Sequence, residues 1–171
     1  MRLSGNMKQF LLILSIFCLM LISCERKKTA EEYYTQSELD RNSKNINSSL
    51  ENLENVIYYY PDHSLAPKAQ YLIGDIYMND LRDFEAAVSA YKLVLEHYQT
   101  SEDSPKAQFM IGYIYANPQF GKIQDLDMAR STYEKFLEKY PNHELAPSVR
   151  FEMENLGKDI NEIPILKHIA T

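Results

Sequence analysis

Histidine and cysteine are the residues of this chain best suited to metal or nucleophilic chemistry, and neither type is arranged as in an enzyme. No spacing typical of metal ligands relates the four histidines, which are His63, His97, His143 and His168. His143-Glu144 opens the segment HELAP, which lacks the second histidine of the zinc-protease motif H-E-x-x-H. The nucleophile motif G-x-S-x-G is also absent. We therefore expect no catalytic residue, no metal ion and no cofactor, and we do not expect an enzyme.

Composition narrows the class of protein further. The 171 residues include 18 basic and 24 acidic side chains, which give a formal net charge of −6. Because nucleic-acid binding needs a basic face, we expect no nucleic-acid partner. With 45% hydrophobic residues, 13 Tyr and 7 Phe, the chain is too apolar and aromatic for a disordered protein. The length allows one domain or a short repeat array.

Cys24 closes an N-terminal segment with the pattern of an export signal. Arg2 and Lys8 precede a nearly unbroken apolar run of 13 residues, Phe10 to Ile22. A membrane span needs about 20 residues, so this run fits a secretory signal better than the alternative, a short transmembrane anchor. The run ends in Leu21-Ile22-Ser23-Cys24, which resembles the lipobox of bacterial lipoproteins.

The resemblance to bacterial lipoproteins implies a cellular location and a lipid anchor. Residues 1–23 would be removed as a signal peptide, and acyl chains on Cys24 would hold the protein to the membrane. The next residue is Glu25 rather than the Asp that retains lipoproteins in the inner membrane, so we expect the outer membrane, with the protein facing the periplasm. Removal of the signal would move the net charge from −6 to −8. Residues 24–29 are expected to be a polar, basic tether.

The remaining chain is built from internal repeats. The segment YPDHSLAPKAQ at Tyr60–Gln70 is repeated as YPNHELAPSVR at Tyr140–Arg150, and YQTSEDSPKAQ at Tyr98–Gln108 lies between them. Gly74 and Gly112 occupy matching places in YLIGDIY and FMIGYIY. Matches in a fixed order indicate one structural unit used several times.

Each unit is predicted to form two helices. The first helix is expected to start at a proline, because proline is tolerated in the first turn, and these prolines are Pro67, Pro105 and Pro147. Apolar residues then recur three and four positions apart. In the first complete unit a polar turn, Asn79 to Asp83, leads to the second helix. The second helix is expected to stop at Tyr-Pro, as at Pro141.

These units resemble the tetratricopeptide repeat, a helix–turn–helix unit of about 34 residues. The residues that carry the resemblance are small residues where helices cross, aromatic residues between helices and closing prolines: Gly74, Gly112, Ala87, Ala129, Tyr77, Tyr91, Tyr115, Tyr133, Pro61 and Pro141. The resemblance implies an all-α fold, a right-handed superhelix of about three repeats and a capping helix, with these tyrosines in the core. The units are longer than those of the family, and Tyr98-Gln99 lacks the closing proline.

The array is predicted to divide after the repeated tyrosines Tyr60, Tyr98 and Tyr140. A degenerate first repeat, breaking near Asn42 to Asn47, is followed by two full repeats, a cap and a tail, with bounds 30–60, 61–98, 99–140, 141–157 and 158–171. The third repeat contains an enlarged turn, Ala116 to Asp127, which either presents Phe120 as an aromatic knob or is only a longer turn. Tail residues such as Ile163, Ile165 and Leu166 are expected to fold back on the cap.

A protein-binding groove is the candidate site. In this superfamily the first helices line a concave groove, and Tyr71, Phe109 and Phe151 occupy equivalent positions there. The full set expected to face the groove is Lys68, Tyr71, Asp75, Lys106, Phe109, Tyr113, Phe151 and Asn155. Aromatic and charged side chains suit an extended segment or a helix of a partner protein. The alternative is an ordinary half-buried surface.

The layout of lipobox, short tether and repeats opening with Y-P-[DN] resembles the lipoproteins of the outer-membrane β-barrel assembly machinery (BamD-like). That resemblance implies a lipid-anchored scaffold whose partners are outer-membrane assembly components, with no small-molecule substrate. Alternatives are an adaptor for envelope or cell-division complexes, a pilotin for a secretin, a subunit of an envelope enzyme, and a structural spacer.

Overall fold

The computed structural model describes residues 26–159 and 162–163. Cys24, the predicted signal peptide, Ile165 and Leu166 lie outside the described residues. The described residues form helices and turns and no strand: α2 (Ala30–Asn42), α3 (Ile46–Tyr59), α4 (Leu65–Ile76), the π-helix η1 (Tyr77–Leu81), α5 (Phe84–His97), α6 (Asp103–Ala116), the 3₁₀ helix η2 (Pro118–Ile123), α7 (Leu126–Lys139) and α8 (Ala146–Glu154).

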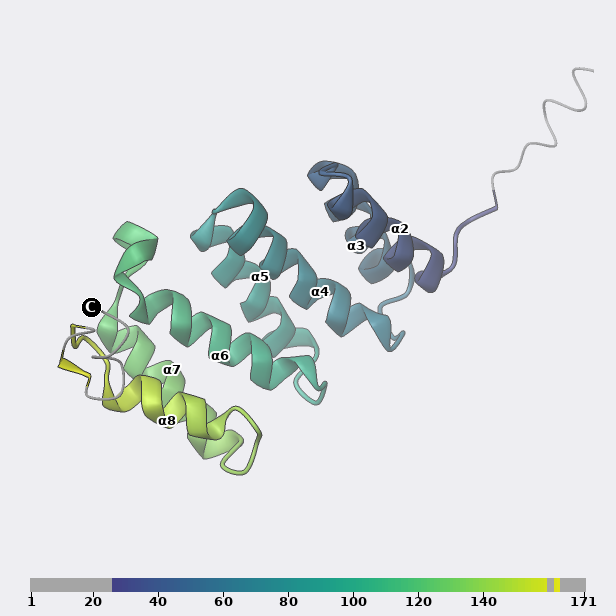
Figure 1. Cartoon of the computed structure of the whole chain (residues 1–171). Helices are drawn as coiled ribbons and strands as arrows, with labels where there is room; N and C mark the ends of the chain where they lie inside the picture. The colour runs from purple at the N-terminus through teal and green to yellow at the C-terminus, as the bar shows by residue number, and fades with distance from the viewer. Residues whose placement is uncertain (1–25, 160–161, 164–171) are drawn as a thin grey trace, which may run out of the picture.

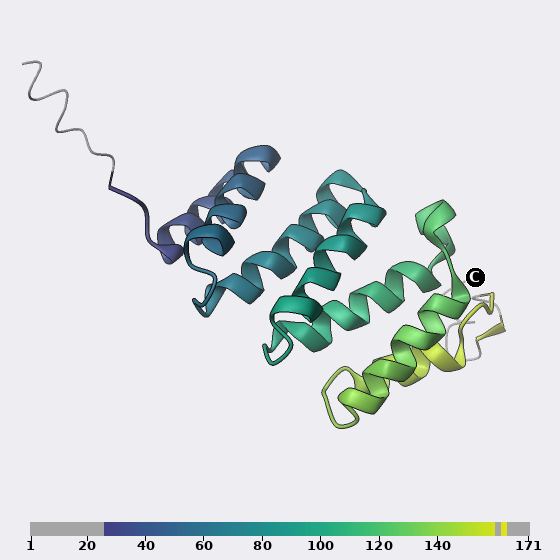
Figure 2. The same ribbon diagram turned by 180° about the vertical axis from the view of Figure 1, so that it is seen from behind.

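The helices form hairpins stacked side by side, with α2 and α3 at one end of the stack and α8 at the other (Figures 1 and 2). The first helix of the middle hairpin, α4, packs against the first helices on either side, α2 and α6. Three hydrophobic clusters run along the stack. The predicted all-α array of repeated hairpins is confirmed. None of the described helices is both long enough and apolar enough to cross a bilayer.

A glycine and a tyrosine set the close approach of the two helices in each full hairpin. A Cβ atom at Gly74 would lie 2.6 Å from Cε1 of Tyr91, and one at Gly112 would come still closer to the ring of Tyr133. Tyr91 and Tyr133 are fully buried, as predicted for core residues. The other two predicted core tyrosines, Tyr77 and Tyr115, are only half-buried and pack against the edges of the clusters.

A repeated hydrogen bond supports the same packing. The side-chain amide of Gln70 on α4 donates to the carbonyl of Ala90 on α5 at 3.2 Å. Gln108 on α6 donates to the carbonyl of Thr132 on α7 at the same distance. Because both glutamines are buried, each of these bonds satisfies a polar group inside the hairpin.

The histidine of the repeated segment has a structural role in the turns between hairpins. Nδ1 of His63 accepts a hydrogen bond from the backbone N–H of Leu65 at 3.2 Å, and His143 does the same for Leu145 at 3.1 Å. Each histidine therefore satisfies a free N–H at the start of a first helix, which is a capping role. The prediction that these helices start at proline is off by one or two residues. Pro67 and Pro105 are the third residues of α4 and α6, and Pro147 is the second residue of α8. Proline is tolerated at each of these positions because no residue of the first helical turn needs its N–H for an intrahelical bond.

The turns inside the two full hairpins are helical. The predicted polar turn after α4 starts as the π-helix η1, and the turn closes on Arg82, which has the left-handed φ of 55°. The enlarged turn of the third repeat contains η2, with Gly121 at φ 72°. Phe120 does not project as a knob, because its ring lies 4.3 Å from Phe84 and 5.7 Å from Tyr113 between centroids.

The two ends of the array are closed differently. At the first unit, residues 43–45 separate α2 from α3, and α2 begins with a capping box in which Thr29 and Glu32 exchange hydrogen bonds. At the other end α8 stops at Glu154, and the chain continues through Gly157 with a left-handed φ of 79°. Ile163 beyond it is buried.

Candidate functional site

The surface formed by the first helices, α2, α4, α6 and α8, carries the candidate site, and we call it the first-helix face. The eight predicted groove residues lie on three of these helices or directly after the last: Lys68, Tyr71 and Asp75 on α4, Lys106, Phe109 and Tyr113 on α6, Phe151 on α8, and Asn155 one residue beyond it. All eight are partly or fully accessible to solvent. No single cleft in the described part of the chain is lined by all eight: seven of them fall into three settings, and Lys106 lines a separate cleft.

The first setting is a polar contact between α2 and α4. The guanidinium of Arg41 on α2 bridges two carboxylates, with 2.8 Å to Asp75 and 2.6 Å to Asp80. The ammonium of Lys68 on α4 lies 5.2 Å from the ring centroid of Tyr34 on α2. Hydrogen bonding to the Tyr34 hydroxyl raises the pKa of Lys68. Asp75 and Lys68 are therefore already engaged within the chain.

The partners in this contact, Tyr34 and Arg41, were missed by the sequence analysis. The first unit lacks the small–aromatic pattern that aligns the other units, so no position in it could be matched to a helix face. The available signal was a basic residue, Arg41, in the last turn of a predicted helix, which does not identify its partners.

The second setting is the packing of the two central aromatic residues. The ring centroid of Tyr71 lies 5.3 Å from that of Tyr91, and that of Phe109 lies 6.4 Å from that of Tyr133. Burial, reinforced by nearby carboxylates, raises the pKa of Tyr71 to about 12. Tyr71 and Phe109 thus act as half-buried packing residues, and only part of each ring remains for a partner.

The third setting is a cleft of about 530 Å³ at the C-terminal end of the array, which we call the tail cleft. Residues from the end of α6, from η2, and from α8 and the chain after it line this cleft, among them Tyr113, Phe151, Glu152 and Asn155. Phe151 is one of the exposed large apolar side chains, with 37% of its surface accessible. Glu152 is half-buried, and burial raises the pKa of its carboxyl group. The tail cleft therefore combines an exposed aromatic ring with a partly desolvated acid.

A second, larger cleft of about 1050 Å³ lies between the turns that follow α3 and α5. Lys68 and Lys106 line it together with His63 and His97. The ammonium of Lys106 is paired with Asp103 at 3.0 Å, so its charge is partly compensated. Among the described residues, no three histidine, cysteine or acidic side chains are grouped so that they could hold a metal ion.

Comparison with known protein families matches two segments, residues 68–101 and 106–143, to the tetratricopeptide repeat. Each segment covers most of one full hairpin, α4 with α5 and α6 with α7, so the middle of the chain carries two tetratricopeptide repeats. A comparison with curated proteins found no match. Tetratricopeptide repeats are typically surfaces for binding other proteins rather than catalytic units, which indicates a protein-interaction scaffold.

Proposed function

We propose that this chain is a lipid-anchored periplasmic scaffold that binds a segment of another protein on its first-helix face. The observation that carries the binding proposal is the tail cleft, where the exposed ring of Phe151 adjoins the half-buried carboxyl of Glu152. The support for the anchor is the sequence Leu21-Ile22-Ser23-Cys24 at the end of an apolar run. The proposed lipid on Cys24 is a covalent attachment and not a cofactor.

The chemistry of the tail cleft specifies the bound segment. The rings of Tyr113 and Phe151 would accept an apolar side chain, because aromatic surfaces supply much of the binding energy at protein interfaces. A carboxylate that burial has partly desolvated is stabilised by a cation, so Glu152 favours a basic side chain close to the apolar one. The proposed partner segment thus carries an apolar and a basic residue near each other.

The proposed partners are components of outer-membrane β-barrel assembly. The support is the order of lipobox, short basic segment and repeats that open with Y-P-[DN], which resembles the lipoproteins of that machinery. An outer-membrane location follows from Glu25 in the position where Asp would retain the protein in the inner membrane.

Affinity capture from detergent-solubilised envelopes tests the binding proposal. The native chain should recover a barrel-assembly subunit, and Phe151→Ala should reduce that recovery about tenfold, as expected for an aromatic hot spot. Met128→Ala is the matched control, because Met128 is 43% exposed, similar to Phe151, but lies on α7, a second helix. If both variants reduce the recovery of the subunit equally, the tail cleft is not the binding site.

The identity of what is captured separates the remaining alternatives. Recovery of only peptidoglycan-associated or division proteins would support an envelope adaptor, and recovery of a secretin would support a pilotin. Uptake of labelled fatty acid by the native chain, and its loss in Cys24→Ala, tests the anchor separately. A native chain that takes up no fatty acid would refute the lipoprotein assignment without affecting the binding assay.

A further inference from the structure

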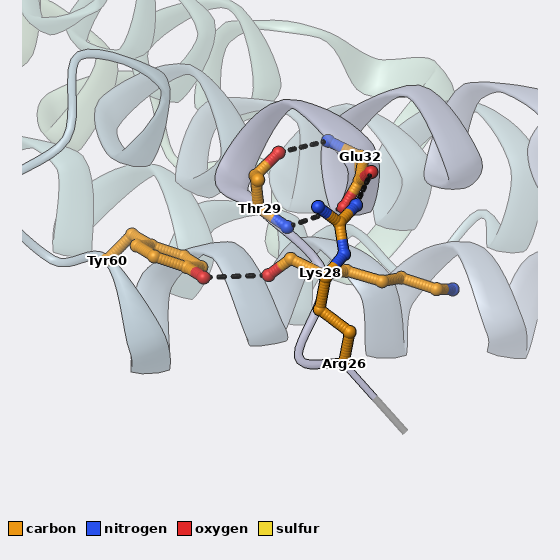
Figure 3. Close-up of polar contacts among 5 residues, drawn as sticks. All are labelled: Arg26, Lys28, Thr29, Glu32 and Tyr60. Atoms are coloured by element: carbon orange, nitrogen blue, oxygen red, sulfur yellow. Dashed lines mark hydrogen bonds and ion pairs between the residues drawn. The ribbon is translucent and has the colours of Figure 1, made fainter. Parts of the chain in front are cut away.

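The segment just before the array is fixed to the first hairpin (Figure 3). Arg26 forms an ion pair with Glu32, whose backbone N–H and carboxylate also bond to Thr29 in the capping box. The hydroxyl of Tyr60 at the end of α3 donates to the carbonyl of Lys28 at 2.7 Å. From Arg26 onward, therefore, the predicted tether lies along the array and does not separate it from the point of attachment.

A tether fixed in this way leaves only a short stretch of chain between Cys24 and the array. Cys24 precedes Arg26 by two residues, and two residues span at most about 7 Å when fully extended. If Cys24 carries the proposed lipid, the bilayer surface must lie close to Arg26. The end of the stack that contains α2 and α3 would then face the membrane, with α8 at the opposite end (Figure 1).

The surface beside this segment has the composition of a membrane-contacting patch. Tyr58 is the most exposed of the large apolar side chains in the described part, at 77%, and its neighbour Tyr59 is 41% exposed. The ammonium of Lys27 lies 3.7 Å from the ring centroid of Tyr59, and that of Lys28 lies 5.5 Å from the ring centroid of Tyr33. Tyrosine is favoured at the membrane interface because its ring is apolar and its hydroxyl is polar.

The charges of this patch are also arranged for an anionic surface. Two of the nearby acids have basic neighbours: Glu32 forms an ion pair with Arg26, and the carboxylate of Glu31 lies 3.2 Å from Nε2 of His63. Lys27 and Lys28 contact tyrosine rings and form no ion pair with a carboxylate in the described part of the chain, so their charges remain available to lipid phosphates. The positive charge is local, since the chain without the predicted signal would carry a net charge of −8.

We infer that Lys27, Lys28, Tyr58 and Tyr59 form a patch that docks on the bilayer surface and fixes the orientation of the array. This inference rests on the lipid anchor of the proposed function. Docking at this end directs the tail cleft away from the membrane, where a partner in the periplasm can reach it. The lipid would thus supply attachment, and the patch would supply orientation.

Tryptophan fluorescence tests the docking directly, because the chain contains no Trp. Tyr58→Trp places a single tryptophan, which can be excited apart from the tyrosines, in the patch with little chemical change. Met128→Trp places one at an exposed site on α7 as the control. Each variant is prepared with its lipid and inserted into vesicles of phosphatidylethanolamine and phosphatidylglycerol that contain brominated lipid. Bromine should quench the emission of Tyr58→Trp several-fold more than that of Met128→Trp.

The charge contribution is tested in the same vesicles. Replacing Lys27 with Gln in the Tyr58→Trp chain should shift the docking equilibrium toward the undocked state by about fivefold, and the quenching should fall. Quenching that is equal at positions 58 and 128 in a protein that floats with the vesicles would overturn the docking inference. The result of the capture assay would be unaffected by that outcome. A protein that takes up no fatty acid and does not float would overturn both the anchor and the docking.

Discussion

The buried hydroxyl groups of Tyr91 and Tyr133 are expected to lower the stability of the fold, although the rings of the same residues pack in its core. Both side chains are fully buried, and neither hydroxyl has a hydrogen-bond partner in the described part of the chain. The rings fill the space beside Gly74 and Gly112, and phenylalanine would preserve that packing. Tyr91→Phe and Tyr133→Phe therefore remove an unsatisfied polar group and leave the core contacts in place.

The expected size follows from the cost of burying an unpaired polar group. That cost is about 1–3 kcal/mol, so each substitution should raise the free energy of unfolding by about 1 kcal/mol or more. The two tyrosines lie in different hydrophobic clusters, so the effects should be nearly additive. Thermal unfolding followed by circular dichroism would show an upward shift of a few degrees for each substitution.

The pH dependence gives a second, independent readout. Burial raises the pKa of both tyrosines above the ordinary value of 10.0, because it favours the neutral phenol over the phenolate. The folded state therefore binds these protons more tightly than the unfolded state, and this stabilisation is fully present below pH 10. Above pH 10 it is lost at about 1.4 kcal/mol per pH unit for each tyrosine, until the pH reaches the folded-state pKa.

The native chain should accordingly lose about 3 kcal/mol more stability per unit above pH 10 than the chain with both phenylalanines. The comparison between the two chains cancels the titration of lysines and of Tyr71, which both chains share. Urea unfolding at a series of alkaline pH values, with tyrosinate absorbance recorded in parallel, measures this difference. Destabilisation of the double variant at neutral pH, or the same alkaline slope in both chains, would refute the reasoning.

Three further substitutions test the packing, an ion pair and a cap. Gly74→Ala forces a Cβ to within 2.6 Å of the buried Tyr91 ring, so a loss of about 1–3 kcal/mol should outweigh the gain in helix propensity in a urea titration. Arg41→Met removes the partner of Asp80 and should lower the free energy of unfolding by about 1–2 kcal/mol, and by less at high salt. A loss of stability that is the same at low and high salt would contradict an ionic origin. His143→Ala should lower the melting temperature by removing a cap of about 1 kcal/mol, and His143→Asn should restore it.

The repeat itself could be predicted from the sequence because one physical contact is used twice. Gly74 with Tyr91 and Gly112 with Tyr133 are pairs at matching positions, and a close helix crossing requires a small residue opposite a large one. The sequence separation of the pair grows from 17 residues in the first full hairpin to 21 in the second, because the enlarged turn lies in the second, and the contact is kept in both. The fold class and the stacking of hairpins follow from that requirement.

Local boundaries were harder to predict, because several residue arrangements satisfy the same rule. Pro67 fits any position in the first helical turn, so it marks the neighbourhood of the start and not the first residue. The turn after α4 contains polar residues, yet it continues as a π-helix, in which Asp80 reaches Arg41 of the preceding hairpin. A contact with a residue 39 positions away leaves no trace in the local pattern.

In the candidate site, too, contacts that are repeated in each hairpin could be predicted, and contacts that occur only once could not. Tyr71, Phe109 and Phe151 were placed by alignment of the units. Two of them pack against core tyrosines, and of the three only Phe151, on the last described helix α8, keeps an open ring. Alignment assigns equivalent positions, but the number of neighbouring hairpins decides how much of each ring remains exposed. The last described hairpin position is consequently where an aromatic residue of the first-helix face is most exposed, which is the physical reason for proposing the tail cleft as the binding site.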